Sequence, residues 1–132
     1  MDQSQINNIV ESIKQQIAVN AQKNNIETNA LQFRISKKQG FNLVPTICKL
    51  FNGNEALGEV KINEMFNIDM VKMPLVNSYL INKLTELSDK NGISIATSSA
   101  RIFTETADNY PLVDLYNEDV LIKKISIEEL LN

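Results

Sequence analysis

The chain has 132 residues, of which 43% are hydrophobic and 22% are charged, values typical of one globular domain. It contains no histidine and one cysteine, Cys48. These counts exclude Ser-His-Asp and Cys-His catalysis, zinc sites with histidine ligands and an intrachain disulfide. The net charge is −3, and acidic and basic residues are interleaved without a basic stripe, so nucleic-acid binding is not favoured.

The composition also carries information about location and origin. No segment is long and apolar enough to predict a membrane-spanning helix, and the first residues lack the basic start and apolar run of a signal peptide. A lone cysteine fits a reducing compartment. We therefore expect a cytoplasmic protein, or one inside an assembly formed in the cytoplasm. Abundant asparagine, isoleucine and lysine, with little arginine, indicate an AT-rich genome such as that of a bacterium or phage.

The first half of the chain predicts one helix followed by three strands. Apolar residues recur every three or four positions over residues 4–24, which is the period of an amphipathic helix, and Asn24-Asn25 is a plausible stop. Alternation of apolar and polar residues predicts a strand at 31–36. A turn at 37–40, a run at 41–51 interrupted by Pro45, a turn at 52–55 and a strand at 56–62 complete an antiparallel meander.

The second half predicts a helix and a β-rich end. Residues 65–72 are ambiguous, and a helix begins near Pro74 and ends at Asn91-Gly92. Short strands are expected at 93–97, 101–104, 112–116 and 120–125. Ser126 and Glu129 form a capping-box pattern for a short final helix with Ile127, Leu130 and Leu131 on its apolar side. The expected order is α-βββ-α-ββββ-α in a single α+β domain over residues 1–132, without an internal repeat.

The best candidate for a ligand site is a polar segment near the third quarter of the chain, formed by Thr97, Ser98, Ser99 and Arg101. Hydroxyl groups can donate to phosphate or carboxylate, and an arginine can grip either with two parallel hydrogen bonds. Arg34 could supply a second charge. No glycine-rich phosphate loop accompanies the segment. The alternative interpretation is a polar connection between two strands, with Arg101 in a surface ion pair.

The N-terminal helix offers a candidate oligomer contact through Ile6, Val10, Ile13 and Ile17. These residues alternate at spacings of four and three, as in the seam of a coiled coil. The alternative, which we favour, is that the stripe packs on the sheet. Sheet edges left open by the β-rich segments are a second place where another subunit could pair.

The remaining reactive residues give weaker signals. Cys48 lies in an apolar strand, where a free cysteine is usually an inert core residue. Five carboxylates gather towards the end of the chain and could in principle hold Mg²⁺ or transfer protons. They lack calcium-loop spacing and fall where turns are expected. We predict no cofactor and no metal site; the carboxylates are Glu105, Asp108, Asp114, Glu118 and Asp119.

These observations lead to three hypotheses about function. The first is a non-enzymatic protein–protein interaction or assembly protein, a homo-oligomer or a structural component of a phage-like virion. The second is a small binding domain that sequesters an anionic ligand or a nucleotide, or that inhibits a host enzyme by docking. The third is a small carboxylate-based enzyme, with or without Mg²⁺.

Overall fold

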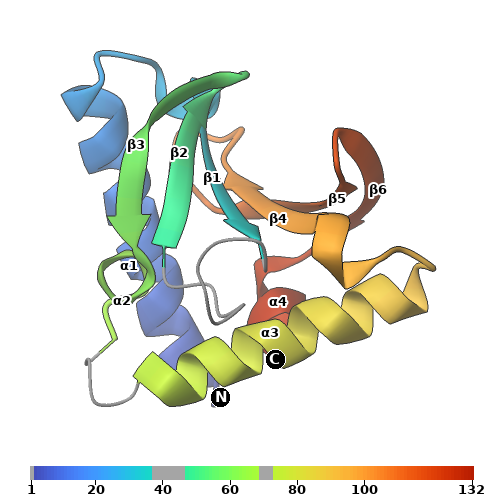
Figure 1. The fold of residues 1–132 in the computed structure, drawn as a ribbon. Helices are drawn as coiled ribbons and strands as arrows, with labels where there is room; N and C mark the ends of the chain where they lie inside the picture. Colours follow the sequence, from blue (N-terminus) through green and yellow to red (C-terminus); the bar gives the residue numbers. More distant parts are fainter. Residues whose placement is uncertain (1, 37–46, 69–72) are drawn as a thin grey trace.

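The computed structural model describes residues 2–36, 47–68 and 73–132 and has the expected α+β architecture. Six antiparallel strands form one sheet in the order β3-β2-β1-β4-β5-β6 (Figure 1). The elements, in chain order, are α1 (Gln3–Lys23), η1 (Thr28–Ala30), β1 (Leu31–Ser36), β2 (Ile47–Asn52), β3 (Glu55–Lys61), α2 (Ile62–Met65), α3 (Met73–Lys90), η2 (Ile95–Thr97), β4 (Ser98–Phe103), β5 (Leu112–Asn117), β6 (Val120–Ile125) and α4 (Ile127–Leu131).

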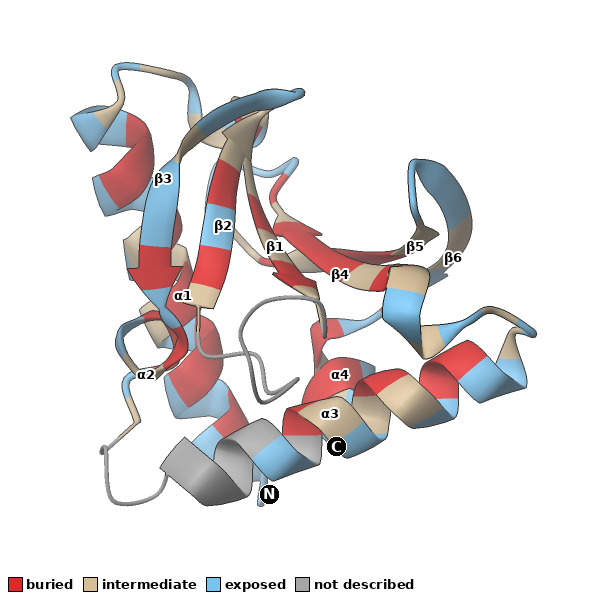
Figure 2. Ribbon diagram, viewed as in Figure 1, coloured by how far each residue is buried: buried red, intermediate tan, exposed pale blue. Residues whose placement is uncertain are grey.

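The core lies between the helices and one face of the sheet. In β1 the residues Leu31, Phe33 and Ile35 are buried, whereas the intervening Gln32, Arg34 and Ser36 are only half-buried. Because neighbouring residues of a strand point to opposite faces, this alternation separates an apolar face from a polar one. Figure 2 shows the buried stripe of α1 turned towards the sheet. Among the residues that the structure describes, no α-helix packs on the polar face of the central strands.

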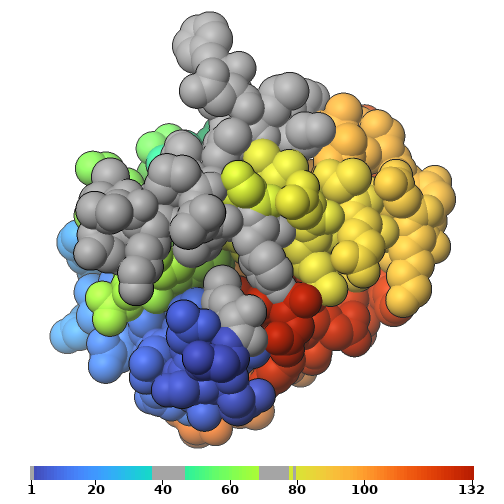
Figure 3. Space-filling model, turned by 90° about the horizontal axis from the view of Figure 1, so that it is seen from below, coloured from blue at the N-terminus to red at the C-terminus, as the bar shows by residue number. Residues whose placement is uncertain are grey.

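The short C-terminal helix packs against both long helices. α4 contacts both α1 and α3, and in Figure 3 the C-terminal end of the chain lies beside the blue start of α1 and the yellow α3. Ser126 caps α4 by accepting a hydrogen bond from the backbone N–H of Glu129, as the capping pattern predicts. Ile127, Leu130 and Leu131 are buried, so the expected apolar side of this helix is confirmed.

Most predicted elements of the first half are confirmed. α1 covers the expected range and ends at Asn24, after which Asn25 adopts a left-handed conformation with φ 55°. The first strand and the turn between Asn52 and Glu55 are also as expected. Ile62 begins the short helix α2 instead of ending the third strand. The turn predicted at 37–40 and the run at 41–46, which includes Pro45, lie outside the described residues.

One predicted strand of the second half is wrong. Residues 95–97 form the 3-10 helix η2, which Ser94 caps by accepting a hydrogen bond from the backbone N–H of Ala96. Gly92, with a φ of 68°, follows the end of α3, and the extended backbone at Ser94 gives way directly to η2. β4 starts at Ser98, and the last third has three described strands where we expected four. Thr97 to Arg101 is therefore not a loop between two strands.

The two halves of the chain repeat one order of elements. A long helix, a 3-10 turn, three antiparallel strands and a short helix occur first as α1 to α2 and again as α3 to α4. The sheet order reads the same from either edge once β1, β2 and β3 are exchanged for β4, β5 and β6. The expectation that the chain has no internal repeat is wrong at the level of structure.

Candidate functional site

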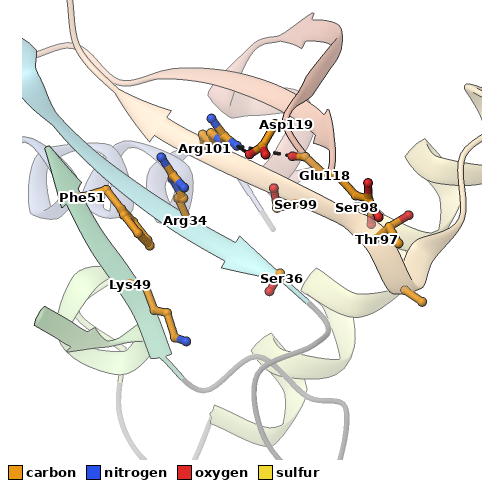
Figure 4. A pocket seen from close by; sticks show the side chains of 11 residues that line it. Arg34, Ser36, Lys49, Phe51, Thr97, Ser98, Ser99, Arg101, Glu118 and Asp119 are labelled. Carbon is orange, nitrogen blue, oxygen red and sulfur yellow. Dashed lines mark hydrogen bonds and ion pairs between the residues drawn. The ribbon is translucent and has the colours of Figure 1, made fainter. Parts of the chain in front are cut away.

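A pocket of about 260 Å³ opens on the polar face of the sheet. Its walls come from β1, β2 and β4, from the end of η2 and from the turn between β5 and β6 (Figure 4). Nine of its lining residues carry charge or a hydroxyl group: Arg34, Ser36, Lys49, Thr97, Ser98, Ser99, Arg101, Glu118 and Asp119. The ring of Phe51 and the methyl group of Ala96 complete the lining.

The centre of the pocket is a pair of opposed arginines. Arg34 of β1 lies directly opposite Arg101 of β4 in the strand register, and in Figure 4 both side chains rise from the same side of the sheet. They are the only two arginines of the chain. Like charges placed directly opposite each other destabilise a sheet. The fold thus keeps an arrangement that costs stability in the absence of a counter-ion.

Each guanidinium group is stacked on an aromatic ring. The central carbon of the Arg34 guanidinium lies 3.8 Å from the centre of the Phe51 ring, and that of Arg101 lies 3.6 Å from the centre of the Tyr116 ring. Such cation–π contacts are favourable and hold the planar group in one orientation. One flat side of each guanidinium is therefore covered by an aromatic ring.

The hydrogen bonds of the two arginines leave donors unused. Arg34 donates from Nη2 to the carbonyl of Gly53 at 2.7 Å and to the side chain of Gln32 at 3.3 Å. Arg101 donates to the carbonyl of Glu118 at 3.4 Å. The Nε atoms of both arginines are buried and have no hydrogen-bond partner among the described residues. A buried donor without an acceptor costs free energy, so an added acceptor would be favourable here.

The nearest counter-charge is only weakly engaged. Asp119 Oδ1 lies 3.6 Å from Arg101 Nη2, and the Asp119 side chain is 97% exposed whereas that of Arg101 is 11% exposed. This separation exceeds the ~2.7–2.9 Å of a charge-assisted hydrogen bond, and exposed ion pairs contribute little. Asp119 is therefore a weak counter-charge for Arg101, and the carboxylate opposite Arg101 in the register, that of Asp114, is paired with Lys124 at 3.5 Å.

The electrostatic cost appears in the titration of Arg34. Partial burial lowers the pKa of its guanidinium, and the adjacent charge of Arg101 lowers this pKa further. Asp119 and Tyr116 act in the opposite direction without reversing the result. Arginine stays protonated at neutral pH, and the part of this shift that Arg101 causes reflects repulsion between the two guanidinium groups. An anion would relieve it.

Of the predicted ligand residues, two lie on the polar face of β4 and line the pocket. Arg101 is at its centre, and Ser99 lies opposite Ser36 in the register. Ser98 and Thr97 line the pocket wall, but their hydroxyl groups hold the chain: Ser98 donates to the carbonyl of Ile95 at 3.0 Å, and Thr97 is hydrogen-bonded to the side chain of Asn117. Arg34 joins Arg101, as the second charge we expected.

Several pocket residues were not predicted from the sequence. Lys49 lies opposite Arg34 on β2, and Phe51 and Tyr116 are the stacking partners. The opposition of Arg34 and Arg101 does have a sequence signal, because one motif occurs twice, at 23–35 and at 90–102. The motif is Lys-Asn-x-Ile, followed after seven further residues by Arg-Ile. The two arginines of this motif are the two arginines of the pocket.

The other candidate residues lie elsewhere. Ile6, Val10, Ile13 and Ile17 are buried in the core, so the favoured packing on the sheet is what the structure shows, and these side chains are not exposed to a partner. Cys48 is fully buried, and burial raises the pKa of its thiol, which keeps it protonated and unreactive. Over the described ranges, no three potential metal-ligating side chains come together.

Within the described part of the chain, no helix is long and apolar enough to cross a membrane. Comparison with protein-family models, with curated proteins and with solved structures finds no match to this chain.

Proposed function

We propose that the protein is a small binding domain for an anionic ligand, which it holds in the pocket between Arg34 and Arg101. The observation that carries this proposal is the direct opposition of the chain's only two arginines, whose buried Nε donors lack acceptors within the described part of the chain. A negatively charged group between them would supply acceptors and relieve the repulsion.

The chemistry of the pocket favours binding over catalysis. Its charged donors are arginine and lysine, which stay protonated at neutral pH and make poor general bases. Glu118 and Asp119 are exposed on the turn, where water screens their charge. A volume of about 260 Å³ lies slightly below the ~300–1,000 Å³ of pockets for drug-sized ligands. The pocket therefore suits a small anion or the charged end of a larger molecule.

The test is titration calorimetry of the purified protein with inorganic phosphate at low ionic strength. We expect saturable binding that Arg101→Ala weakens by roughly 10- to 100-fold, because hydrogen bonds to charged groups contribute about 1.5–3 kcal/mol. Lys90→Ala, which removes one exposed positive charge from the end of α3, is the matched control and should bind like wild type.

Arg101 is nine-tenths buried, so its replacement could also affect folding. Circular dichroism and a denaturation curve establish whether the Arg101→Ala protein is folded, and Arg34→Ala offers an independent route because Arg34 is less buried. If folded variants bind phosphate as wild type does, the anion-binding proposal is wrong.

Assembly through a sheet edge is the second candidate function. β6 is an outer strand of the sheet, and its first residues, Val120 and Leu121, are 63% and 42% exposed. An open edge strand with exposed apolar residues can pair with a second copy of the chain. Light scattering over a concentration series should then give a discrete oligomer that Leu121→Lys dissociates; a monomer at every concentration would exclude this candidate.

A further inference from the structure

The two halves of the chain match residue by residue around the two arginines. A shift of 67 positions carries Asn25 onto Gly92, both left-handed, and η1 and β1 onto η2 and β4. The hydrogen bonds that end the two long helices correspond as well: Ile26 N–H donates to the carbonyl of Ala21, and Ile93 N–H donates to that of Ser88. The same shift carries Arg34 onto Arg101.

The hairpins that follow match at a shift of 65 positions. Both have a register irregularity, at Leu50/Phe51 in one and at Leu115/Tyr116 in the other. Both turn through a left-handed residue, Gly53 with φ 60° and Glu118 with φ 55°. Each arginine therefore stacks on the equivalent ring and donates to the equivalent turn carbonyl of its own half.

The strand register places an approximate twofold axis between the two arginines. Phe33 pairs with Ile102 and Ile35 pairs with Ala100, on either side of the central pair of Arg34 and Arg101. Exchanging equivalent residues of the two halves turns the first of these pairs into the second and leaves the central pair unchanged. The two arginines thus lie opposite each other across this axis, and each guanidinium group rests on the aromatic ring of its own half.

A row of charged residues crosses the sheet, and Arg34 and Arg101 stand at its centre. From β3 to β6, residues opposite each other in register are Glu59, Lys49, Arg34, Arg101, Asp114 and Lys124. Each half sets one acid opposite one lysine in the outer two positions. Equivalent outer positions carry opposite charges in the two halves, whereas the central position carries an arginine in both. Each half therefore contributes one positive charge that its own row does not balance.

We infer that the ligand group is a tetrahedral phosphate dianion that sits on this axis and is held by both arginines at once; this inference rests on the proposed anion-binding function. A guanidinium fork binds two oxygens of one anion, so two forks on one anion need at least three oxygens, of which the forks can share one. Inorganic phosphate offers four oxygens and a phosphate monoester offers three free ones. A carboxylate offers two, which satisfy one fork.

The polar wall next to the arginines fits the same ligand class. Ser36 and Ser99 face each other one step along β1 and β4 from the arginine pair, and Lys49 adds a positive charge on the β2 side. A phosphodiester has one negative charge and two free oxygens, so the nucleic-acid backbone is a poorer match. The preferred ligand is therefore free phosphate or the phosphate end of a monoester.

The test compares four anions by calorimetry on the full chain: inorganic phosphate, methyl phosphate, dimethyl phosphate and acetate. We expect the first or second to bind with one site per chain, and dimethyl phosphate and acetate to bind at least about tenfold more weakly, because each has a single negative charge and only two free oxygens. Tight binding of methyl phosphate identifies monoesters as the ligand source, and loss of affinity on methylation identifies free phosphate.

Arg34→Lys and Arg101→Lys test whether both halves hold the same anion. Each keeps its charge and loses the fork, so each should lower phosphate affinity by about tenfold, and the double variant should lose less than the product of the two single effects. If no anion binds, the proposed function itself fails. If acetate binds as well as phosphate, or if only one arginine matters, anion binding stands and the shared site on the axis is wrong.

Discussion

The N-terminal and C-terminal half-sites share a scaffold and differ in their counter-charges. Arg34 and Arg101 each stack on an aromatic ring and donate to the carbonyl of a left-handed turn residue. Next to that turn residue stands Asn54 in the first half and Asp119 in the second. The first half thus leaves its arginine with neutral acceptors among the described residues, whereas the second supplies a weak carboxylate. Both halves retain the arginine as a hydrogen-bond donor. They differ in how far a neighbouring side chain neutralises the charge of that arginine.

The helical side of the molecule shows a second contrast between the halves. Ala21 of α1 and Ser88 of α3 are equivalent and both are buried, but the Ser88 hydroxyl has no hydrogen-bond partner in the described structure. Ile17 and Leu84 are also equivalent and fully buried. Both pairs of equivalent positions are buried although their side chains differ. The core therefore requires a side chain of similar size at these positions more than one particular residue type.

The largest effects should come from truncating equivalent core residues. Ile17→Ala and Leu84→Ala should each lower the free energy of unfolding by about 2–5 kcal/mol, because both leave a cavity. The pairing of β1 with β4 joins the halves in one sheet, so each variant should unfold in a single transition in urea. Val19→Ala, at an exposed position of α1, should change stability by less than about 0.5 kcal/mol. Two separate transitions would show that the halves fold independently.

Ser88→Ala should stabilise the protein by about 1 kcal/mol, because it removes a buried hydroxyl without a partner. The equivalent Ala21 shows that a methyl group fits this position of the repeat. Thermal or urea denaturation measures the change. The reverse substitution in the other half, Ala21→Ser, should destabilise by a similar amount. Equal destabilisation by both substitutions would mean that the Ser88 hydroxyl is satisfied in solution.

Asp119→Asn should raise phosphate affinity by roughly threefold, since exposed ion pairs contribute at most about 1 kcal/mol. The substitution gives the second half the neutral side chain that the first half has at Asn54. Asn54→Asp, the mirror change, should lower the affinity by a similar factor, and Asp89→Asn is the control for a charge change outside the pocket. Unchanged affinity in both pocket variants would mean that the turn carboxylate does not compete with the ligand.

The smallest effect concerns a hydrogen bond within the second half, next to α1. The carboxylate of Glu128, which accepts a 2.5 Å hydrogen bond from the Tyr110 hydroxyl, raises the pKa of Tyr110 to about 12, with burial as a second cause. Lys14 of α1 lies 5.7 Å from the centre of the same ring. Because the folded state favours neutral Tyr110, this contribution to stability is complete below the ordinary pKa of 10.0 and is lost as the pH rises towards 12.

Tyr110→Phe removes this titration, so its stability should fall less steeply than that of wild type between pH 10 and 12. Urea denaturation at several pH values in this window measures the difference. Tyr116→Phe, whose ring stacks on Arg101, serves as a tyrosine control from outside the contact. Identical pH profiles for wild type and Tyr110→Phe would contradict the assignment.

The periodicity of the sequence predicted most helices and strands because a period near 3.6 or 2 reports directly on which face is buried. Periodicity did not predict the 3-10 turn at Ile95–Thr97. The alternation of Ile93 and Ile95 resembles that of a strand, whereas the turn depends on a local hydrogen bond from the Ala96 N–H to the Ser94 side chain. A three-residue element leaves no periodic pattern.

The candidate site was only half predictable. Ser99 and Arg101 could be selected by residue type, but their pairing with Ser36 and Arg34 depends on β1 lying beside β4, and several strand orders fit the same elements. The internal repeat could not be predicted from the sequence because few positions around the arginines are identical in the two halves of the chain. What the halves share is mostly backbone geometry, including left-handed residues as different as Gly53 and Glu118.

The most direct test of the shared anion site is a crystal structure of the protein grown with inorganic phosphate. The account predicts one phosphate between the guanidinium groups of Arg34 and Arg101, with at least one oxygen within hydrogen-bond distance of each. A pocket filled only by water at saturating phosphate, or a phosphate bound to one arginine alone, would contradict it.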